Sequence, residues 1–360
     1  MKKALVTGAA GFIGSNVVRE LLSENVEVRA MVLPGEDTRN LAGLDIERIE
    51  GNVLDPSSID RALSGCDTLF HLAAVYSLWA PERKIFYDVN LQGSRNVLWS
   101  ARRADVEKVV YTASIAALGV KKGMLCADEE TPFNQYHRAN DYVLTKHISC
   151  QEALTFAREG TPVVVVNPCF PYGEGDVAPT PTGKILLDVA NRVQFMTYEG
   201  GINVVDVKDV ARGHVLAARK GRVGEMYILG NKNITMKELF ELAAREAGVD
   251  VRIIKMPMPL TLLYGYLWKK LADFTGTQPT TTHQEVAYSR QYLFYDVSKA
   301  QRELGLRLTP VEVSIRRALD WYEANGYIPR KGALVRLTSA IERLPFLRKK
   351  HLPAEGGASA

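Results

Sequence analysis

The chain has 360 residues, of which 46% are hydrophobic and 24% charged, and its formal net charge at pH 7 is +4. This length predicts two domains, or one domain with an added lobe, and the composition is typical of a soluble globular protein. Four scattered cysteines without a C-x-x-C pair argue against a disulfide framework and a zinc site, so we expect no metal and a reducing compartment.

The positive charge is concentrated in the tail 330–360, which has seven basic and two acidic residues. The rest of the chain is nearly neutral, so we expect no nucleic-acid partner. The first residues run directly into an apolar segment, and no apolar run reaches the roughly 18 residues of a membrane span. We therefore expect a cytoplasmic protein without a signal peptide.

The first predicted elements surround the segment 7–14, TGAAGFIG. Residues 3–6 form an apolar run typical of a buried strand, and apolar residues from position 13 onward recur at helical spacing. The first glycine permits a tight turn, the second lets a pyrophosphate approach the backbone, and the third lets the helix pack on the strand. This context predicts a dinucleotide-binding loop. The expected cofactor contacts here are Gly8, Gly11, Phe12, Ile13 and Gly14.

The second predicted strand, residues 26–32, ends without a carboxylate that would hold the ribose 2′-hydroxyl of NAD. Arg39 follows a few residues later and could meet a 2′-phosphate. We therefore predict NADP as the cofactor, with NAD as the alternative.

The third and fourth strands are predicted at 46–52 and 68–74, with a helix beginning at Asp55-Pro56 between them. Ala73 and Ala74 are small and leave room for the cofactor over the edge of the sheet. His71, in the same strand, is either a ligand or base, or a hydrogen-bonded core histidine. Its apolar neighbours favour the core interpretation.

A fifth strand, 109–114, places Ser114 at the carboxyl edge of the sheet, where open α/β folds bind ligands. Asn90, in the helical stretch before this strand, either orients a catalytic tyrosine or water or packs the helix. Tyr142 and Lys146 lie one turn apart if their segment is helical. The ammonium would then lower the pKa of the phenol, so that Tyr142 exchanges a proton with a substrate oxygen that Ser114 holds.

The second half begins with a buried parallel strand at 163–166, followed by a Pro- and Gly-rich segment, 169–183. Tyr172, Thr180 and Thr182 either line a substrate pocket there or are ordinary loop residues. Residues 203–217 are expected to return toward the sheet. Capping-box patterns at Thr235 and Thr309 predict the starts of two further helices.

These motifs resemble the extended short-chain dehydrogenase/reductases, over about residues 3–327. The resemblance rests on TGAAGFIG at 7–14, on Ser114 and on YVLTK at 142–146. More narrowly, the chain is similar to the dihydroflavonol-reductase and 3β-hydroxysteroid-dehydrogenase branch, and most closely to hopanoid-associated sugar epimerases. Segments 76–81, 179–183 and 227–230 carry that similarity. Leu33 and Asn52 differ from the arginine and aspartate common in the family.

The resemblance implies an α/β Rossmann fold, a doubly wound parallel sheet with a smaller, discontinuous C-terminal substrate lobe. Residues 1–168, with 203–230 returning, would form the dinucleotide-binding domain, and 169–202 and 231–329 the substrate lobe. Ser114, Tyr142 and Lys146 would be catalytic, and Tyr142 and Lys146 would also contact the cofactor, Lys146 at its nicotinamide ribose. Further cofactor contacts are expected from Asn52, Val53 and Pro168, and further substrate contacts from Tyr76 and Trp79.

Two segments outside the motifs leave a membrane contact open. Residues 256–268 are apolar nearly all round and either roof an apolar pocket, dip into a membrane surface, or form a packed helix. The tail 330–350 has apolar residues spaced three and four apart among basic ones. It would lie peripherally on anionic lipid, dock on the body of the protein, or stay solvated. Many relatives are dimers, which leaves a homodimer open.

The favoured function is an oxidoreductase that interconverts a secondary alcohol and a ketone on a hydrophobic polycyclic substrate, such as a sterol or hopanoid intermediate. If a carboxylate lies beside the alcohol, the oxidised product could lose CO₂. The alternative is a nucleotide-sugar epimerase or dehydratase with retained NAD, although the loop 169–183 offers only Lys184, just beyond its end, for a diphosphate. A third class, a redox-sensing regulator, typically lacks the Tyr-Lys pair that is present here.

Overall fold

The computed structural model describes residues 1–76, 82–193, 196–197, 199–250, 253–255 and 291–328. Trp79, the apolar segment 256–268 and the tail 330–360 lie outside this part of the chain, so what the sequence predicts for them stays a prediction. None of the helices in the described part is both long enough and apolar enough to cross a bilayer.

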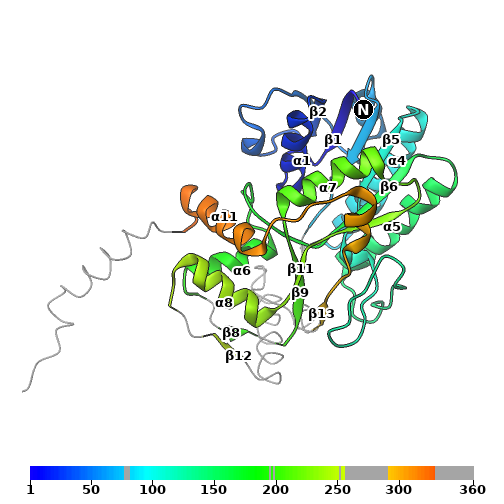
Figure 1. Cartoon of the computed structure of the whole chain (residues 1–360). Helices are drawn as coiled ribbons and strands as arrows, with labels where there is room; N and C mark the ends of the chain where they lie inside the picture. The colour runs from blue at the N-terminus through cyan, green and yellow to red at the C-terminus, as the bar shows by residue number, and fades with distance from the viewer. Residues whose placement is uncertain (77–81, 194–195, 198, 251–252, 256–290, 329–360) are drawn as a thin grey trace, which may run out of the picture.

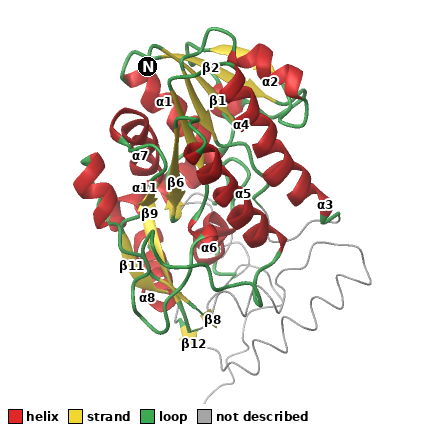
Figure 2. Cartoon of the chain, turned by 90° about the vertical axis from the view of Figure 1, so that its right-hand side faces the viewer, coloured by secondary structure: helices red, strands yellow, loops and turns green. Residues whose placement is uncertain are grey.

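A seven-stranded sheet forms the centre of the larger lobe (Figures 1 and 2). Its strand order is β10-β6-β5-β4-β1-β2-β3, and every neighbouring pair is parallel. This confirms the doubly wound parallel sheet. The strands are β1 (Lys3–Thr7), β2 (Glu27–Val32), β3 (Glu47–Glu50), β4 (Thr68–His71), β5 (Lys108–Thr112), β6 (Val163–Pro168) and β10 (Met226–Leu229).

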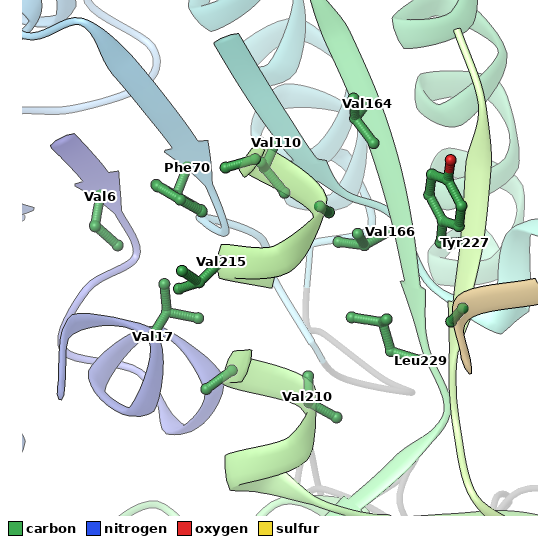
Figure 3. Packing of buried hydrophobic residues seen from close by; sticks show 14 of the residues in the cluster. Val6, Val17, Phe70, Val110, Val164, Val166, Val210, Val215, Tyr227 and Leu229 are labelled. Carbon is green, nitrogen blue, oxygen red and sulfur yellow. The ribbon is translucent and has the colours of Figure 1, made fainter. Parts of the chain in front are cut away.

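Helices cover both faces of this sheet, and the strand residues alternate between two cores. Val164 and Val166 of β6 belong to the core under α1 (Phe12–Ser23) and α7 (Val207–Lys220), which Figure 3 shows. Val163 and Val165 face the opposite core, under α2 (Pro56–Leu63), α4 (Ser94–Arg103) and α5 (Asp141–Arg158). All four valines are fully buried, as predicted for a strand covered on both faces.

A second, smaller sheet organises the other lobe, at the lower end of the molecule in both cartoons. It contains β7 (Phe170–Tyr172), β9 (Gly201–Asp206), β11 (Lys232–Thr235) and β13 (Tyr292–Leu293). Helices α6 (Pro181–Ala190), α8 (Met236–Ala247) and α11 (Val311–Ala324) share its hydrophobic core. A two-stranded pair, β8 (Met196–Thr197) with β12 (Ile254–Lys255), lies beside it.

Several boundaries of strands and lobes differ from those that the sequence predicts. The return from the smaller lobe begins at α7 and not at Asn203, because β9 is an inner strand of the smaller sheet, paired with three other strands. Strand β4 ends at His71, so Ala73 and Ala74 lie in the loop beyond it. The short elements are η1 (Arg39–Leu41), α3 (Lys84–Phe86), η2 (Tyr87–Gly93), η3 (Ile115–Ala117) and η4 (Ala300–Leu304).

Candidate active site

The glycine loop lies where the strand order reverses, between β1 and β4, which is where open α/β sheets bind ligands. Gly8 has a φ of +65°, and a Cβ there would lie 2.7 Å from the Ala73 nitrogen. A Cβ on Gly14 would lie 2.0 Å from the Gly8 carbonyl oxygen. The structure therefore requires glycine at both positions, one for the turn and one for close packing of the helix.

Gly11 differs from the other two, because its neighbours leave room on one side. A Cβ at this exposed residue would meet, within 4 Å and among the described residues, only the Gly8 carbonyl oxygen, at 3.3 Å. Gly11 is the N-cap of α1, which has no side-chain cap and no acidic residue in its first turn. The N–H groups of that turn and the positive end of the helix dipole are therefore free to receive an anion. The loop fits a dinucleotide pyrophosphate.

Helix α5 carries Tyr142 and Lys146 one turn apart, as the spacing predicts. Asn140 caps the helix by accepting a hydrogen bond from the Val143 nitrogen at 2.9 Å. Tyr142 is 8% exposed and Lys146 4% exposed. The Lys146 ammonium donates to the Thr112 carbonyl oxygen at 2.7 Å, which fixes it at the carboxyl end of β5. Burial lowers the pKa of Lys146 to about 8, so the ammonium stays mainly protonated at neutral pH.

Ser114 follows the same strand and begins the short helix η3. Its hydroxyl oxygen accepts a hydrogen bond from the Ala116 nitrogen at 3.1 Å. That bond uses a lone pair and leaves the hydroxyl proton as a donor. Ser114 and the anchor of Lys146 are thus two residues apart at one edge of the sheet.

His71 is a core residue, and the core interpretation of the sequence is confirmed. Thr7 Oγ1 accepts from the Leu72 and Ala73 nitrogens, at 3.3 Å each, so its proton goes to His71 Nδ1 at 2.8 Å. The opposite ring nitrogen, Nε2, then donates to Ser94 Oγ at 3.2 Å. Burial lowers the pKa of His71 to about 3, which keeps the ring neutral.

Asn90 lies in η2, a segment of π-helix, and joins two parts of the site. Its Oδ1 accepts from the Val75 nitrogen at 2.7 Å, and its Nδ2 donates to the Val75 carbonyl oxygen at 3.2 Å. The same Nδ2 lies 3.4 Å from Thr145 Oγ1 on α5. Asn90 therefore fastens the loop after β4 to the helix that carries Tyr142.

The predicted substrate residues divide into two groups. The ring of Tyr76 lies 5.3 Å from that of Tyr142, and its hydroxyl is 3.4 Å from Thr182 Oγ1. Thr180 instead caps α6 by accepting from the Gly183 nitrogen, and it donates to Asp176. Tyr172 is buried in the core of the smaller lobe. Tyr76 and Thr182 thus approach Tyr142, whereas Thr180 and Tyr172 support the lobe.

The end of β2, where the sequence predicts the adenosine ribose, contains a carboxylate that was not predicted, that of Glu36. The turn after β2 returns the chain, so that the Leu33 nitrogen donates to Glu36 Oε2 at 2.9 Å. Pro34-Gly35 was the available signal, since this pair favours a turn. Arg39 is 64% exposed but forms an ion pair with Asp37 at 2.6 Å.

The other predicted cofactor residues follow β3 or end β6. Asn52 accepts a hydrogen bond from the Leu54 nitrogen, and Val53 is buried against Gly93. Pro168 ends β6. The assignment of these residues to the cofactor stays a prediction.

Comparisons with known proteins show a family and several relatives along most of the chain. A family model described as the NAD dependent epimerase/dehydratase family matches residues 4–230. "Sterol demethylase protein B" of Methylococcus capsulatus is 31% identical, over 90% of this chain and 99% of its own length. The mouse protein "Sterol-4-alpha-carboxylate 3-dehydrogenase, decarboxylating" is 25% identical, over 89% of this chain and 90% of its own.

Two solved structures are similar along most of the chain. The crystal structure of gox2253 has 37% identity and a TM-score of 0.82, covering 91% of this chain and 100% of the other. PA4631, described as a nucleoside-diphosphate-sugar epimerase from Pseudomonas aeruginosa, has 26% identity and a TM-score of 0.75, covering 91% and 99%.

Proposed function

The chain belongs to the NAD dependent epimerase/dehydratase family, and from that premise we propose that it interconverts a secondary alcohol and a ketone on a hydrophobic polycyclic substrate such as a sterol intermediate. Enzymes of this family act on CH–OH groups with a nicotinamide cofactor, and this chain is one of them. The finer proposal concerns the substrate and the residues that handle its oxygen and proton.

The observation that carries the proposal is that Ser114 and the Lys146 anchor, Thr112, lie two residues apart at the carboxyl end of β5, with Tyr142 one turn before Lys146 on α5. The nicotinamide, when bound, accepts or supplies the hydride. Ser114 donates a hydrogen bond to the substrate oxygen and holds it. Tyr142 takes the hydroxyl proton during oxidation and returns it during reduction. The buried Lys146 ammonium favours the phenolate that this exchange requires.

An apolar substrate fits the surroundings of Tyr142. This tyrosine belongs to a hydrophobic cluster with Phe86, Ala116 and Val143, and Val75 and Phe133 pack against it. Apolar side chains of this kind offer dispersion contacts to a ring system but few hydrogen-bond partners to a sugar. The names of the Methylococcus and mouse relatives point to sterols as well.

A decarboxylation step follows from the chemistry if the substrate has a carboxylate on the carbon next to the alcohol. Oxidation then gives a β-keto acid. Its carboxyl C–C bond breaks, CO₂ leaves, and the enolate that remains takes up a proton to form the ketone. Only the first step needs the nicotinamide, and the second needs no further oxidant. We include this step in the proposal on the strength of the mouse relative's name.

The test is to incubate the protein with NAD or NADP and a 3β-hydroxysteroid, with and without a 4-carboxyl group. We expect nicotinamide reduction with both substrates and CO₂ release only with the carboxylated one. Tyr142→Phe is the matched control, since it keeps the ring and removes the proton. If no polycyclic alcohol reduces the cofactor, the proposed substrate class is wrong.

A nucleotide-sugar epimerase or dehydratase is the second candidate, and the similarity to PA4631 favours it. That reaction returns the hydride to the same sugar, so NAD stays bound between turnovers. Tightly bound NAD in the purified protein, together with turnover of a sugar nucleotide, would favour this candidate over the first.

For the cofactor, we propose that Arg39 binds the 2′-phosphate when the cofactor is NADP. When it is NAD, the Glu36 carboxylate accepts a hydrogen bond from the 2′-hydroxyl. Arg39 supports NADP because its guanidinium is exposed, whereas its ion pair with Asp37 and the nearby Glu36 support NAD. Titration of both dinucleotides into wild type and Arg39→Ala separates the two. We expect the variant to lose NADP affinity selectively.

We further propose a peripheral membrane contact through the basic tail and the segment 256–268. Each basic residue near an anionic surface contributes roughly 1 kcal/mol to binding, and the tail has seven. Co-sedimentation with anionic liposomes should retain the full chain and lose a chain cut at Arg330. Equal binding of the two chains would exclude the tail as the anchor. The homodimer remains a proposal that measurement of the mass in solution decides.

A further inference from the structure

The segment 173–176 leaves the smaller lobe after β7 and reaches the glycine loop of the larger lobe. Asn16, on α1, donates from Nδ2 to the Glu174 carbonyl oxygen at 3.0 Å. Asn40, in η1, donates from Nδ2 to the Gly175 carbonyl oxygen at 2.8 Å. The two asparagines are 4% and 5% exposed, so these bonds are shielded from water. Two buried side chains of the dinucleotide-binding lobe therefore hold the backbone of the substrate lobe.

Asn40 also contacts the glycine loop itself. The same Nδ2 donates to the Ala10 carbonyl oxygen at 3.1 Å, between Gly8 and Gly11. One amide thus bridges the loop expected to receive the pyrophosphate and the segment 173–176. Asn40 also directly follows Arg39, the residue expected at the adenosine ribose. The glycine loop and Arg39, the two places where the sequence predicts contacts with the dinucleotide, thus both adjoin Asn40.

Gly175 has a backbone conformation that favours glycine, although a Cβ there would make only ordinary contacts. Its φ is +96°, and a Cβ there would lie 3.4 Å from Asn40 Oδ1 and 3.5 Å from Asn16 Nδ2. The positive φ turns the chain so that two successive carbonyl groups point at the two asparagines. The segment is therefore held by a specific backbone shape as well as by two hydrogen bonds.

The next residue extends this contact into the substrate lobe. Asp176 is buried and accepts hydrogen bonds from the Thr180 nitrogen at 3.0 Å, the Thr180 hydroxyl at 2.9 Å and the Tyr322 hydroxyl at 2.6 Å. Thr180 begins α6, whose Thr182 lies against Tyr76 beside Tyr142. A continuous set of contacts thus leads from the glycine loop to the substrate side of the catalytic tyrosine.

We propose that Asn16 and Asn40 form a latch through which a bound dinucleotide orders residues 173–183 and so positions the substrate side of the site. The dinucleotide restrains the Ala10 peptide group, and the Asn40 side chain, bonded to both Ala10 and Gly175, then restrains Gly175. Asp176, the next residue, restrains the start of α6 through its bonds to Thr180. A ligand that pays the ordering entropy of a segment makes the next ligand bind more tightly, without any large movement. The inference rests on the proposed function for its cofactor and is independent of the substrate.

Hydrogen exchange followed by mass spectrometry tests the latch without a known substrate. The probes are NAD and NADP, each added at saturation to the full-length protein. In wild type we expect slower exchange of the amides in 7–14, where the dinucleotide binds, and also in 173–183. Coupling between sites is typically about 5- to 150-fold, so a slowing of at least about fivefold is expected in the second segment.

The variant Asn40→Ala removes both donated bonds of the latch residue. We expect the dinucleotide still to protect 7–14 in this variant but to lose its effect on 173–183. Asn16→Ala removes the bond to Glu174 and should show a partial loss, and it serves as the test if Asn40→Ala does not fold. Asn231→Ala is the matched control, because it removes a bond of the same kind, from Nδ2 to the Thr309 carbonyl oxygen at 2.7 Å, between residues that are not expected to contact the dinucleotide.

The outcomes separate the latch from the cofactor assignment. Protection of 7–14 without protection of 173–183 in wild type would overturn the latch and leave the cofactor assignment standing. Protection of 173–183 that survives in both latch variants would also overturn it. No protection at either segment would overturn the cofactor assignment together with the latch. Loss of protection in Asn231→Ala as well would make the effect general loosening and would contradict a specific latch.

Discussion

Gly11 and Gly14 lie three residues apart, yet a methyl group would meet different surroundings at the two positions. At Gly14 it would overlap the Gly8 carbonyl oxygen, so Gly14→Ala should lower the free energy of unfolding by about 1–3 kcal/mol or more. At Gly11 the backbone is extended and the outer side is open, so Gly11→Ala should fold normally but bind the dinucleotide at least about tenfold more weakly. Thermal unfolding and dinucleotide titration measure the two effects. Equal loss of stability in both variants would contradict this distinction.

Lys146 is the residue whose charge the proposed proton exchange depends on. Replacing it by methionine keeps much of the stem and removes the ammonium, so the phenol of Tyr142 should become a weaker acid. We expect kcat for alcohol oxidation to fall by about 10²- to 10⁴-fold and the rising limb of its pH profile to move to higher pH. Lys146→Arg, which keeps the charge, should retain the position of that limb. A fall in kcat with an unmoved limb would mean that Lys146 only places the cofactor or the helix.

His71 and His214 make the stability of the fold sensitive to acid. Burial lowers the pKa of His71 to about 3 and that of His214 to about 4, whereas in the unfolded chain both titrate near about 6.5. As the pH falls through about 6.5, the unfolded chain binds protons that the folded chain cannot, so stability is full above this pH and is lost below it. Lowering the pH from about 7.5 to about 5.5 should therefore reduce the free energy of unfolding by about 1.4 kcal/mol for each histidine.

Urea unfolding at the two pH values measures this loss. His71→Gln should reduce the pH dependence by one histidine's share, whatever its own effect on stability at neutral pH. If the free energy of unfolding changes as much between the two pH values in the variant as in wild type, His71 does not contribute the acid sensitivity that its burial predicts.

At the scale of residues, the sequence predicted local geometry better than long-range partners. The roles of Gly8 and Gly14, and the core position of His71, followed from their flanking residues. Glu36 was missed because its carboxylate reaches the end of β2 through a turn, and no pattern within the strand records it. Asn16 and Asn40 gave no signal at all, since their acceptors lie more than 130 residues away or in a different loop.

A buried hydrogen bond joins helix α11 to Asp176, in the segment before α6, in addition to the hydrophobic core that the two helices share. The Tyr322 hydroxyl donates to Asp176, whose carboxylate would lose a partner in Tyr322→Phe. We expect this change to lower the free energy of unfolding by about 1.5–3 kcal/mol, since the acceptor is a buried charge. Tyr327→Phe is the matched control. It removes a bond from a half-buried tyrosine to the neutral Val177 carbonyl oxygen and should cost about 0.5–1.5 kcal/mol. If the two variants lower the free energy of urea unfolding equally, the hydrogen bond to Asp176 stabilises the fold no more than the bond to a neutral carbonyl oxygen.

Helix starts show why element boundaries were only partly predictable. The capping box at Thr235 is confirmed, with the Thr235 hydroxyl accepting from the Glu238 nitrogen and the Glu238 carboxylate accepting from the Thr235 nitrogen. At Thr309 the predicted helix start is confirmed, because α11 begins at Val311, but the capping box does not form. The Thr309 nitrogen and hydroxyl both donate to Asp209 of α7, and Pro310 is the N-cap. A local motif therefore predicted the helix start, but its capping bonds were lost to a buried carboxylate from elsewhere in the chain.

The two lobes are joined at several separated points, and this governs how the whole molecule should unfold. Besides the latch, Asp209 on α7 holds Thr309 of the smaller lobe, and the buried Tyr295 hydroxyl donates to the Ile115 carbonyl oxygen beside Ser114. The sequence predicted that the chain crosses between the lobes more than once. It did not predict these contacts, because they join segments that are distant in the sequence.

Because of these contacts we expect the lobes to unfold together, in one transition that a dinucleotide shifts as a whole. Trp99 on α4 and Trp321 on α11 lie in different lobes. Because the chain has four tryptophans, two variants that each keep one of these two residues, with the other three tryptophans replaced by Phe, report the lobes separately. The urea midpoints of the two variants should coincide with each other and with the midpoint from circular dichroism. A dinucleotide at about 100 times its Kd should raise the free energy of unfolding by about 2.7 kcal/mol in every probe. If the dinucleotide shifts only the signal of the larger lobe, the lobes are not energetically coupled, and the inter-lobe contacts hold them together without transmitting the binding of the cofactor.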